Sequence, residues 1–256
     1  MKEKVKIKYE RIANHSQTSG IVSSCSGEKE YSNISDDYAH ADGYESAADL
    51  GLGCGLPVAL AKISTGDVII DLGCGAGNDC FISRAETGPT GRVIGLDFAS
   101  AMIEIANRNR DKLGYDNVEF IQGDIEAMPL NDCIADVVVS NCVLNLVPDK
   151  AKAFSEIYRI LKPGGHFSIS DIVVAGEMSS TLQSELEEYA GCLSGAIQLQ
   201  DYLKIIKGAG FTEIEIQKKR GIEVPEKMLL KHINKEDQYQ FNQSFGIFSI
   251  SVLAKK

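Results

Sequence analysis

A short apolar run followed at once by a glycine-rich turn constrains the fold of this chain more than any other feature. The run Val68-Ile69-Ile70 leads directly into the segment Asp71-Leu72-Gly73-Cys74-Gly75-Ala76-Gly77. An uninterrupted apolar run is typical of a parallel strand that is buried on both faces. Glycine lets the backbone turn tightly and approach a ligand without side-chain obstruction. The pattern therefore predicts a strand and a ligand-binding loop of an open α/β sheet.

The same alternation of strand and helix patterns continues along most of the chain. Apolar runs predict further strands, and helical spacing of apolar residues predicts helices between most of them. One helix is expected to end at Lys162-Pro163-Gly164-Gly165, because proline cannot continue a helix and glycine supplies positive φ. We expect strands at residues 68–71, 92–97, 118–122, 135–140, 166–171, 212–218 and 246–254, and helices at 5–13, 79–85, 99–113, 150–161, 182–190 and 200–208.

Length and charge restrict the domain count and the classes of partner. The 256 residues lie near the upper limit of what one hydrophobic core organises, so we expect one main α/β domain with small additions. The chain carries 26 Lys and Arg against 36 Asp and Glu, a formal net charge of −10. This charge repels phosphate backbones and anionic lipids. We therefore expect no nucleic-acid partner and, since no run reaches the ~18 apolar residues of a membrane span, no membrane partner.

Cysteine usage indicates a reducing compartment. The seven cysteines, at positions 25, 54, 74, 80, 133, 142 and 192, form no Cys-x-x-Cys pair. Residues 1–13 alternate Lys and Glu with isolated apolar residues and lack the apolar centre of a secretion signal. An odd number of cysteines without an export signal favours reduced thiols. We expect a cytoplasmic protein.

Acidic residues at the ends of the predicted strands indicate what the glycine loop binds. A dinucleotide fold requires Gly-x-Gly-x-x-Gly to hold pyrophosphate, whereas this loop has Gly-x-Gly-x-Gly behind Asp71, and an acid suits a cationic ligand. Asp97 closes the next strand, where a carboxylate can accept hydrogen bonds from both ribose hydroxyls. Gly123-Asp124-Ile125-Glu126 follows the third strand, where an acid could meet the exocyclic amine of adenine. An isolated acid would be read as a solvated loop residue, but the ordered set favours a site.

This ordered set, together with Leu161-Lys162-Pro163-Gly164-Gly165, resembles class I S-adenosylmethionine (AdoMet)-dependent methyltransferases over residues 45–220. The resemblance implies a doubly wound, mostly parallel, Rossmann-like seven-stranded sheet. One antiparallel strand near an edge would come from the late strands, with an N-terminal arm and a small cap added. The cofactor-binding residues that it implies are Asp71, Gly73, Cys74, Gly75, Asp97, Phe98, Asp124, Ile125, Glu126 and Asn141.

The resemblance also implies a division of the chain into three parts. We expect residues 1–43 to form a flexible N-terminal arm, because they are polar and rich in Ser, Asp and Asn. Residues 44–221 would form the methyltransferase domain, with a segment at 175–200 that covers the acceptor. Residues 222–256 would be a C-terminal extension that contributes the last strand.

Three cysteines are candidates for the acceptor site. Cys142 follows the fourth strand, at the sheet edge where open α/β folds bind ligands. Cys192 lies after a predicted helix in the covering segment, and Cys54 stands between two glycines just before the core begins. A cysteine is more often a small buried residue that packs like an apolar side chain than a functional thiol. We favour this interpretation for the side chains of Cys74, Cys80 and Cys133. Asn141 and Asn145 receive supporting roles.

Local motifs narrow the resemblance further, to microbial arsenite methyltransferases over most of residues 43–211. The motifs are Gly53-Cys54-Gly55-Leu56-Pro57, Gly77-Asn78-Asp79-Cys80, Gly114-Tyr115-Asp116-Asn117-Val118, Ser140-Asn141-Cys142 and Tyr189-Ala190-Gly191-Cys192. The family resemblance implies that Cys142 and Cys192 hold As(III) and that Cys54 joins them or forms a disulfide with them. It implies a thiol-relay role for Cys25.

Thiolates suit a soft, thiophilic centre such as As(III), whether it arrives as arsenite or as a thiol conjugate. Its lone pair can attack the sulfonium methyl group in line, so the reaction requires no general base. We therefore expect arsenite methylation, with thioredoxin or glutathione as reductant and the metalloid as substrate. Two alternatives remain open at this point. One is methylation of a small organic acceptor such as a quinone, sterol or polyketide ring, and the other is a non-catalytic protein that binds the metalloid or AdoMet.

Overall fold

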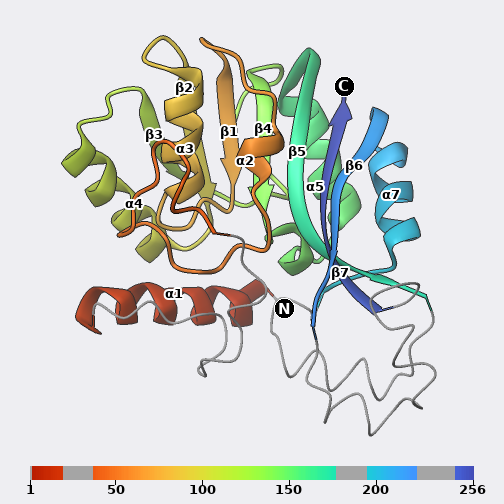
Figure 1. Ribbon diagram of the computed structural model, residues 1–256, viewed down its shortest axis with the longest axis horizontal. Coiled ribbons are helices and arrows are strands. Elements are labelled where there is room, and N and C mark those ends of the chain that lie inside the picture. Colours follow the sequence, from red (N-terminus) through yellow and green to blue (C-terminus); the bar gives the residue numbers. More distant parts are fainter. Residues whose placement is uncertain (1, 20–36, 177–194, 224–245) are drawn as a thin grey trace, which may run out of the picture.

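The computed structural model describes residues 2–19, 37–176, 195–223 and 246–256. The described elements are α1 (Lys2–Ser19), α2 (Pro57–Leu60), β1 (Val68–Leu72), α3 (Asn78–Thr87), β2 (Arg92–Asp97), α4 (Ser100–Leu113), β3 (Val118–Gln122), β4 (Ala135–Asn141), the 3₁₀ turn η2 (Leu144–Leu146), α5 (Lys150–Ile160), β5 (Leu161–Ala175), α7 (Leu199–Gly208), β6 (Thr212–Gly221) and β7 (Gly246–Lys255). From residue 57 to residue 175 helices and strands alternate, except that β3 is followed directly by β4 (Figure 1).

Seven strands form one sheet in the order β3-β2-β1-β4-β5-β7-β6. The strands from β3 to β5 pair in parallel, and β7 is antiparallel to both of its neighbours, β5 and β6. This confirms the expected doubly wound sheet with one antiparallel strand near an edge. The chain reaches the outer edge with β3 and returns to the centre with β4, so the strand order reverses between β1 and β4. Open α/β sheets bind ligands beside such a switch point.

Local sequence explains where several elements begin and end. Helix α3 begins after Gly77, whose φ of +100° is favourable only for glycine. Gly114, with φ of +67°, ends α4. The side chain of Asp149 caps α5 by accepting a hydrogen bond from the Lys152 amide at 2.9 Å. Within the described ranges, no helix has both the length and the apolarity that crossing a bilayer requires.

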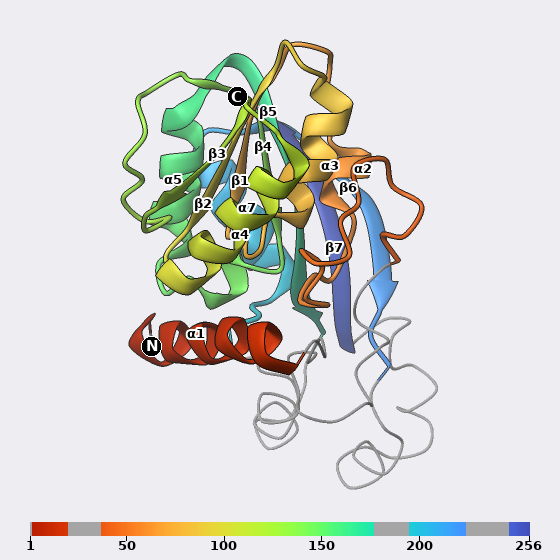
Figure 2. The same ribbon diagram turned by 90° about the vertical axis from the view of Figure 1, so that its left-hand side faces the viewer.

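Two apolar layers cover the two faces of the sheet (Figures 1 and 2). One layer packs α5 and α7 against the sheet around Phe154, Phe167 and Tyr202. The other packs α3 and α4 against the opposite face around Phe81 and Met102. Helix α1 lies across the end of the sheet toward which β1 points, beside α4 (Figure 1). It therefore covers the carboxyl end of the parallel strands, where a ligand of this fold is expected.

Several elements are longer than the sequence pattern predicts, and α1 and β5 exceed their expected bounds the most. The helix expected at residues 5–13 extends over Lys2–Ser19, and the strand expected at 166–171 extends over Leu161–Ala175. Lys162-Pro163-Gly164-Gly165 thus ends α5 as expected, but it lies inside β5 rather than in a loop. The helix predicted at residues 182–190 lies outside the described residues.

Candidate active site

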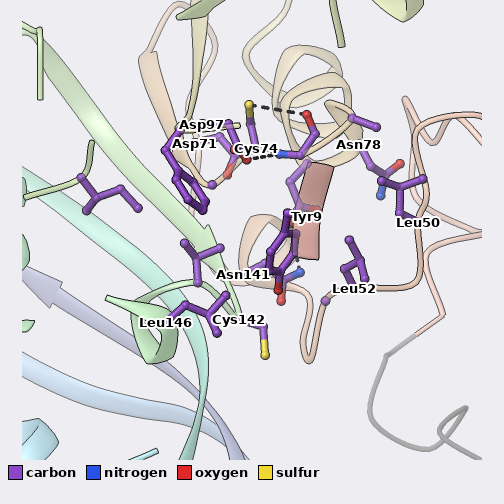
Figure 3. A pocket seen from close by; sticks show the side chains of 18 of the residues that line it. Tyr9, Leu50, Leu52, Asp71, Cys74, Asn78, Asp97, Asn141, Cys142 and Leu146 are labelled. Carbon is purple, nitrogen blue, oxygen red and sulfur yellow. Dashed lines mark hydrogen bonds between the residues drawn. The ribbon is translucent and has the colours of Figure 1, made fainter. Parts of the chain in front are cut away.

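A cavity opens at the carboxyl ends of β1, β2 and β4, under α1 (Figure 3). It encloses about 1110 Å³ of empty space, part of which is open to solvent. Its walls come from the glycine loop, the ends of the neighbouring strands, the loop before α2, and α1. Residues that line the cavity include Lys2, Val5, Tyr9, Tyr38, Leu50, Leu52, Gly53, Asp71, Gly73, Cys74, Gly75, Asp79, Asp97, Phe98, Asp124, Ile125, Asn141, Cys142, Val143 and Leu146.

The glycine loop allows a ligand to approach its backbone closely. Gly73 has φ of +72°, and a Cβ there would lie 2.4 Å from Val143 Cγ2, so this glycine packs against the loop after β4. Gly75 has φ of +53°, and a Cβ there would meet no atom within 4 Å. Because Gly75 lines the cavity, that open space belongs to the ligand site.

Asp97 fixes the loop from the end of β2. Its two carboxylate oxygens accept hydrogen bonds from the amides of Gly75 at 3.0 Å and Ala99 at 2.9 Å. Burial raises the pKa of Asp97 to about 6, although the amides of Ala99, Gly75 and Phe98 oppose the rise. The carboxylate thus lies at the cavity wall, in the position expected for a group that binds ribose.

Two further buried carboxylates lie beside the loop. Asp71 accepts a hydrogen bond from the Cys80 thiol at 3.2 Å, and burial together with the charge of Asp79 raises its pKa well above the ordinary value. Burial raises the pKa of Asp79 to about 6. Among the described residues, Asp79 Oδ1 has no hydrogen-bond partner. Three buried carboxylates around one cavity favour a ligand with positive charge, and the ammonium and sulfonium groups of AdoMet fit this requirement.

Helix α1 places a cation over the acidic loop that follows β3. Lys2 Nζ donates to Asp124 Oδ2 at 2.6 Å and also contacts Glu126, whose other oxygen accepts from the Asp149 amide at 2.8 Å. Burial acts to raise the pKa of Asp124, but the hydrogen bonds from Lys2 and from the Glu126 amide, together with the charges of Lys2 and Lys152, outweigh it and the pKa falls below the ordinary value. A basic residue of α1 therefore contacts the carboxylate that sequence reasoning assigns to adenine.

Asn141 connects the cavity to the loop that carries Cys54. Its Oδ1 accepts from the Cys54 amide at 2.9 Å, and its Nδ2 donates to the Gly55 carbonyl at 2.9 Å and to Asp79 Oδ2 at 3.1 Å. Tyr38 also contacts Asn141, and its hydroxyl donates to the Gly55 carbonyl at 2.9 Å. A Cβ on Gly53 would lie 2.6 Å from Asn141 Nδ2, so the loop packs directly on this side chain.

Cys142 follows Asn141 and lines the cavity. Its φ of +61° is unusual for a residue with a side chain, and its amide donates to the Ser170 carbonyl at 2.7 Å. Cys54 is fully buried just outside the cavity lining, and its carbonyl accepts from Ser249 Oγ at 2.6 Å. The structure therefore brings the segments of Cys54 and Cys142 together at Asn141. Cys25 and Cys192 lie outside the described residues.

The remaining cysteines test the packing interpretation. Cys74 and Cys80 are buried, as expected. Cys133 is exposed, with φ of +52°, so the prediction that it packs in the core is wrong. It stands in the turn that leads into β4. The local apolar pattern does not distinguish such a turn from a strand start.

Sequence reasoning missed several residues of the cavity. Lys2 and Tyr9 come from α1, and Tyr38 comes from the polar region before the core. Their contacts join positions more than 100 residues apart, as in the pair Tyr38 and Asn141. Asp79 stands in the first turn of α3, and its acidic side chain directly after the glycine loop was the one available signal. Glu126 contacts Lys2 but lies outside the lining.

Comparison with known proteins shows the family. A methyltransferase domain family matches residues 63–210. The arsenite methyltransferase of Halobacterium salinarum is 40% identical over 234 residues, which cover 85% of this chain and 59% of that protein. The crystal structure of an arsenic(III) S-adenosylmethionine methyltransferase from Chlamydomonas reinhardtii is 34% identical, with a TM-score of 0.66, and the match covers 80% of this chain and 67% of that one.

A relative with a different acceptor also matches. The demethylmenaquinone methyltransferase of Lactococcus lactis is 32% identical over 177 residues, which cover 61% of this chain and 70% of that protein. The chain spans 59% of the length of the Halobacterium relative and of a second arsenite methyltransferase, from Aquipseudomonas alcaligenes. The fold, the acidic cavity and these matches agree. The chain belongs to the family of AdoMet-dependent methyltransferases and is similar to arsenite methyltransferases.

Proposed function

We propose that this protein methylates trivalent arsenic with AdoMet as methyl donor, and that cysteine thiolates hold the arsenic during the reaction. One observation supports the proposal most strongly: Cys142 lines the same cavity as the glycine loop and Asp97. A donor that is bound by that loop would therefore share one space with a thiol. The segment of Cys54 is held against the neighbouring Asn141.

The cofactor assignment follows from charge and position. When bound, AdoMet supplies an electrophilic methyl group on a sulfonium centre. Asp97 would accept the ribose hydroxyls, and Asp124 would accept the adenine amine after Lys2 moves aside. Asp71 and Asp79, which are buried and negatively charged when ionised, would compensate the positive charge of the ligand. The remaining predicted cofactor residues, Phe98 and Ile125, line the cavity as apolar walls.

Thiol chemistry supports As(III) as acceptor. When a thiol replaces a hydroxide on arsenite, an S–H bond and an As–O bond break, an S–As bond forms, and the proton leaves with the hydroxide as water. The arsenic keeps its lone pair, and attack of this pair on the methyl carbon of AdoMet would form an As–C bond, break the methyl–sulfonium bond and release S-adenosylhomocysteine, with no general base. Arsenic would give up two electrons in this step and pass from As(III) to As(V), and a thiol reductant would restore the trivalent state. Alignment of the two reactants in a water-poor site can lower the activation free energy by about 7 to 11 kcal/mol. The protein's main task is therefore positioning.

The same chemistry defines the partners and the compartment that we propose. Cysteines that cycle through arsenic binding and oxidation need a thiol reductant, thioredoxin or glutathione, and a reducing cytoplasm. Cys25 would relay thiols between the reductant and the site. Cys192 would provide a further sulfur ligand, from the segment that leads toward Gly195.

The decisive experiment is incubation with labelled AdoMet, arsenite and a dithiol, followed by speciation of the arsenic products. Methylated arsenicals and S-adenosylhomocysteine should appear together. Cys142→Ser and Cys192→Ser should each abolish methylation, and Cys54→Ser should slow it. Cys133→Ser is the matched control, because this cysteine is exposed and lies outside the cavity lining, and it should leave the rate unchanged. Failure of the wild-type protein to make any methylarsenical would refute the proposal.

The match to a demethylmenaquinone methyltransferase favours one second candidate, methylation of a small quinol ring. Leu50, Leu52 and Leu146 give the cavity apolar walls that a ring could contact. A reduced naphthoquinone replaces arsenite in the same assay. Methylation of the quinol that persists in Cys142→Ser would favour this candidate. A protein that only binds would form no S-adenosylhomocysteine with either acceptor.

A further inference from the structure

A second polar cluster lies apart from the cofactor cavity, within the apolar layer between the sheet and helices α5 and α7. Lys150 at the start of α5, Asp171 on β5 and Tyr202 on α7 are all buried there. The Tyr202 hydroxyl donates to Asp171 Oδ2 at 3.1 Å. The negative charge of Asp171 opposes the effect of burial, which lowers the pKa of Lys150. Burying a lysine and a carboxylate is often less favourable than burying apolar side chains of similar volume. The proposed reaction uses neither group.

Lys150 fixes the loop that carries Cys142. Its Nζ donates to the carbonyls of Asn145 and Val147, both at 3.2 Å. Asn145 is three residues beyond Cys142 in the same loop and is itself buried. Its side-chain amide has no hydrogen-bond partner among the described residues, and its backbone contacts the cluster on both sides, because its carbonyl accepts from Lys150 and its N–H donates to Asp171. The lysine therefore determines where this loop lies.

Gly195 rests on the same carbonyl. A Cβ at this position would lie 1.7 Å from Asn145 O and 3.6 Å from Lys150 Nζ, so no larger residue fits without movement. The segment then joins β5, because the Val174 amide donates to the Ile197 carbonyl at 3.0 Å. In the sequence, Gly195 stands three residues after Cys192. The contact thus joins the Cys142 loop to the described segment that begins at Gly195.

The cluster lies within electrostatic reach of the acceptor thiols. Burial and the charge of Asp171 raise the pKa of the Tyr202 hydroxyl, and Cys54 and Cys142 contribute to the rise. The amide of Cys142 donates to the carbonyl of Ser170, the residue before Asp171. The Cys142 loop, β5 and α7 therefore meet beside Cys54 and Cys142.

We propose that Lys150, Asn145 and Gly195 form a positioning junction that sets the spacing between the Cys142 loop and the segment beginning at Gly195. The inference rests on the proposed function and identifies residues that control its thiol geometry. As(III) must engage two or three sulfurs at once, so its affinity depends on their effective concentration. A reagent that alkylates one thiol has no such requirement. The junction should affect chelation and leave single-thiol chemistry intact.

Gly195→Ala tests the spacing directly. The added methyl group must displace the segment from Asn145, so arsenite affinity should fall by about tenfold or more, while AdoMet affinity changes by less than about twofold. Gly208→Ala in α7 is the matched control, because its Cβ would meet no atom within 4 Å. Arsenite binding is measured by calorimetry, and alkylation of Cys142 by mass spectrometry. Alkylation should proceed at the wild-type rate or faster.

Lys150→Met tests the other half of the junction, with Lys152→Met, an exposed lysine of the same helix, as control. Thermal unfolding identifies any variant that fails to fold, and Lys150→Arg, which keeps a cation, should recover part of the arsenite affinity. In the folded variants the KM for arsenite should rise more than kcat falls. A general structural defect would instead weaken AdoMet binding as well.

Two outcomes separate this inference from the proposed function. If the wild-type protein methylates arsenite and Gly195→Ala binds it with unchanged affinity, the junction is refuted and the function stands. If the wild-type protein binds no arsenite, the function is refuted. A short bifunctional thiol reagent then still tests the spacing, because slower crosslinking in Gly195→Ala than in Gly208→Ala would support the junction and equal rates would refute it.

Discussion

At the scale of single residues, the cavity is defined by carboxylates that the fold buries. Asp79 and Asp97 each have a pKa raised to about 6, with burial as the main cause. A strand-end acid after a glycine loop is visible in the sequence, which is why Asp97 was predicted. The unpartnered oxygen of Asp79 could not be predicted, because the surroundings of this side chain include Tyr38 and Asn141, which are distant in the chain.

These raised pKa values predict the pH dependence of stability. Both folded carboxyls bind protons more tightly than the unfolded chain, whose ordinary value is 3.8. The stability that protonation contributes is present at low pH and is lost as pH rises from about 4 to about 6. Urea unfolding of the ligand-free protein should therefore show a midpoint that falls across this window. AdoMet should stabilise more strongly above pH 6 than below it.

The control for this trend is a carboxyl on the surface. Asp116 is exposed, so Asp116→Asn should leave the slope with pH unchanged. Asp79→Asn should flatten it. A wild-type midpoint that rises steadily from pH 4 to pH 6 would show that these carboxylates are ionised without cost in the folded state.

Asn141 carries a second prediction at this scale. Asn141→Ala removes the acceptor of the Cys54 amide and the donor to the Gly55 carbonyl, and it leaves these buried groups without their partner. The free energy of unfolding should fall by about 2 to 4 kcal/mol, as measured with urea. Asn107→Ala, which loses one bond to its own helix at the Ile103 carbonyl, should cost less than about 1 kcal/mol. Equal losses would contradict the proposed role of Asn141 in holding the loop.

At the scale of elements, the glycine loop combines two requirements that a matched pair of variants can separate. Gly75 and Gly114 both have positive φ, +53° and +67°, and a Cβ at either would meet no atom within 4 Å. Alanine should therefore cost each site about 1 to 2 kcal/mol of conformational strain. Gly75 lines the cavity and Gly114 ends α4, so AdoMet affinity should fall only in Gly75→Ala. Calorimetric titration of both variants checks this, and equal affinities would place the ligand elsewhere.

Local periodicity was sufficient to predict all seven strands and the helices between β1 and β5, because each of them except β6, whose residues are exposed or half-buried, buries an apolar face. It was insufficient for α1, which extends over Lys2–Ser19. The length of α1 depends on contacts of Val5 and Tyr9 with the cavity and of Ala13 with the core, and no local pattern records these. The extension of β5 to Ala175 likewise depends on its pairing with β7.

At the scale of the whole molecule, β7 connects the sheet. Its residues 246–254 are all buried, and it pairs with β5 on one side and β6 on the other. Deletion of residues 246–256 should therefore abolish cooperative unfolding, as measured by circular dichroism during heating. Deletion of residues 1–19 should leave a folded protein with weakened AdoMet binding, because α1 contacts α4 and the loop after β3 and pairs with no strand of the sheet. A folded, cooperative protein without β7 would contradict this account.

The order of the strands in the sheet could be predicted only in part. Family resemblance implied the antiparallel hairpin near an edge, and the glycine loop located the ligand end. The set of groups around the cavity required the tertiary structure, since Lys2 reaches Asp124 and Tyr38 reaches Asn141. The residues that hold the cysteines in place were therefore less predictable than the cysteines themselves.

The place of β7 between two strands made earlier also has a consequence for biosynthesis. A ribosome makes β5 well before residues 246–255, so the nascent sheet carries an open edge along the ten residues of β5, 166–175, that later pair with β7. Unpaired edges are sites of association between chains. We expect the nascent chain to depend on chaperones until its final strand is inserted.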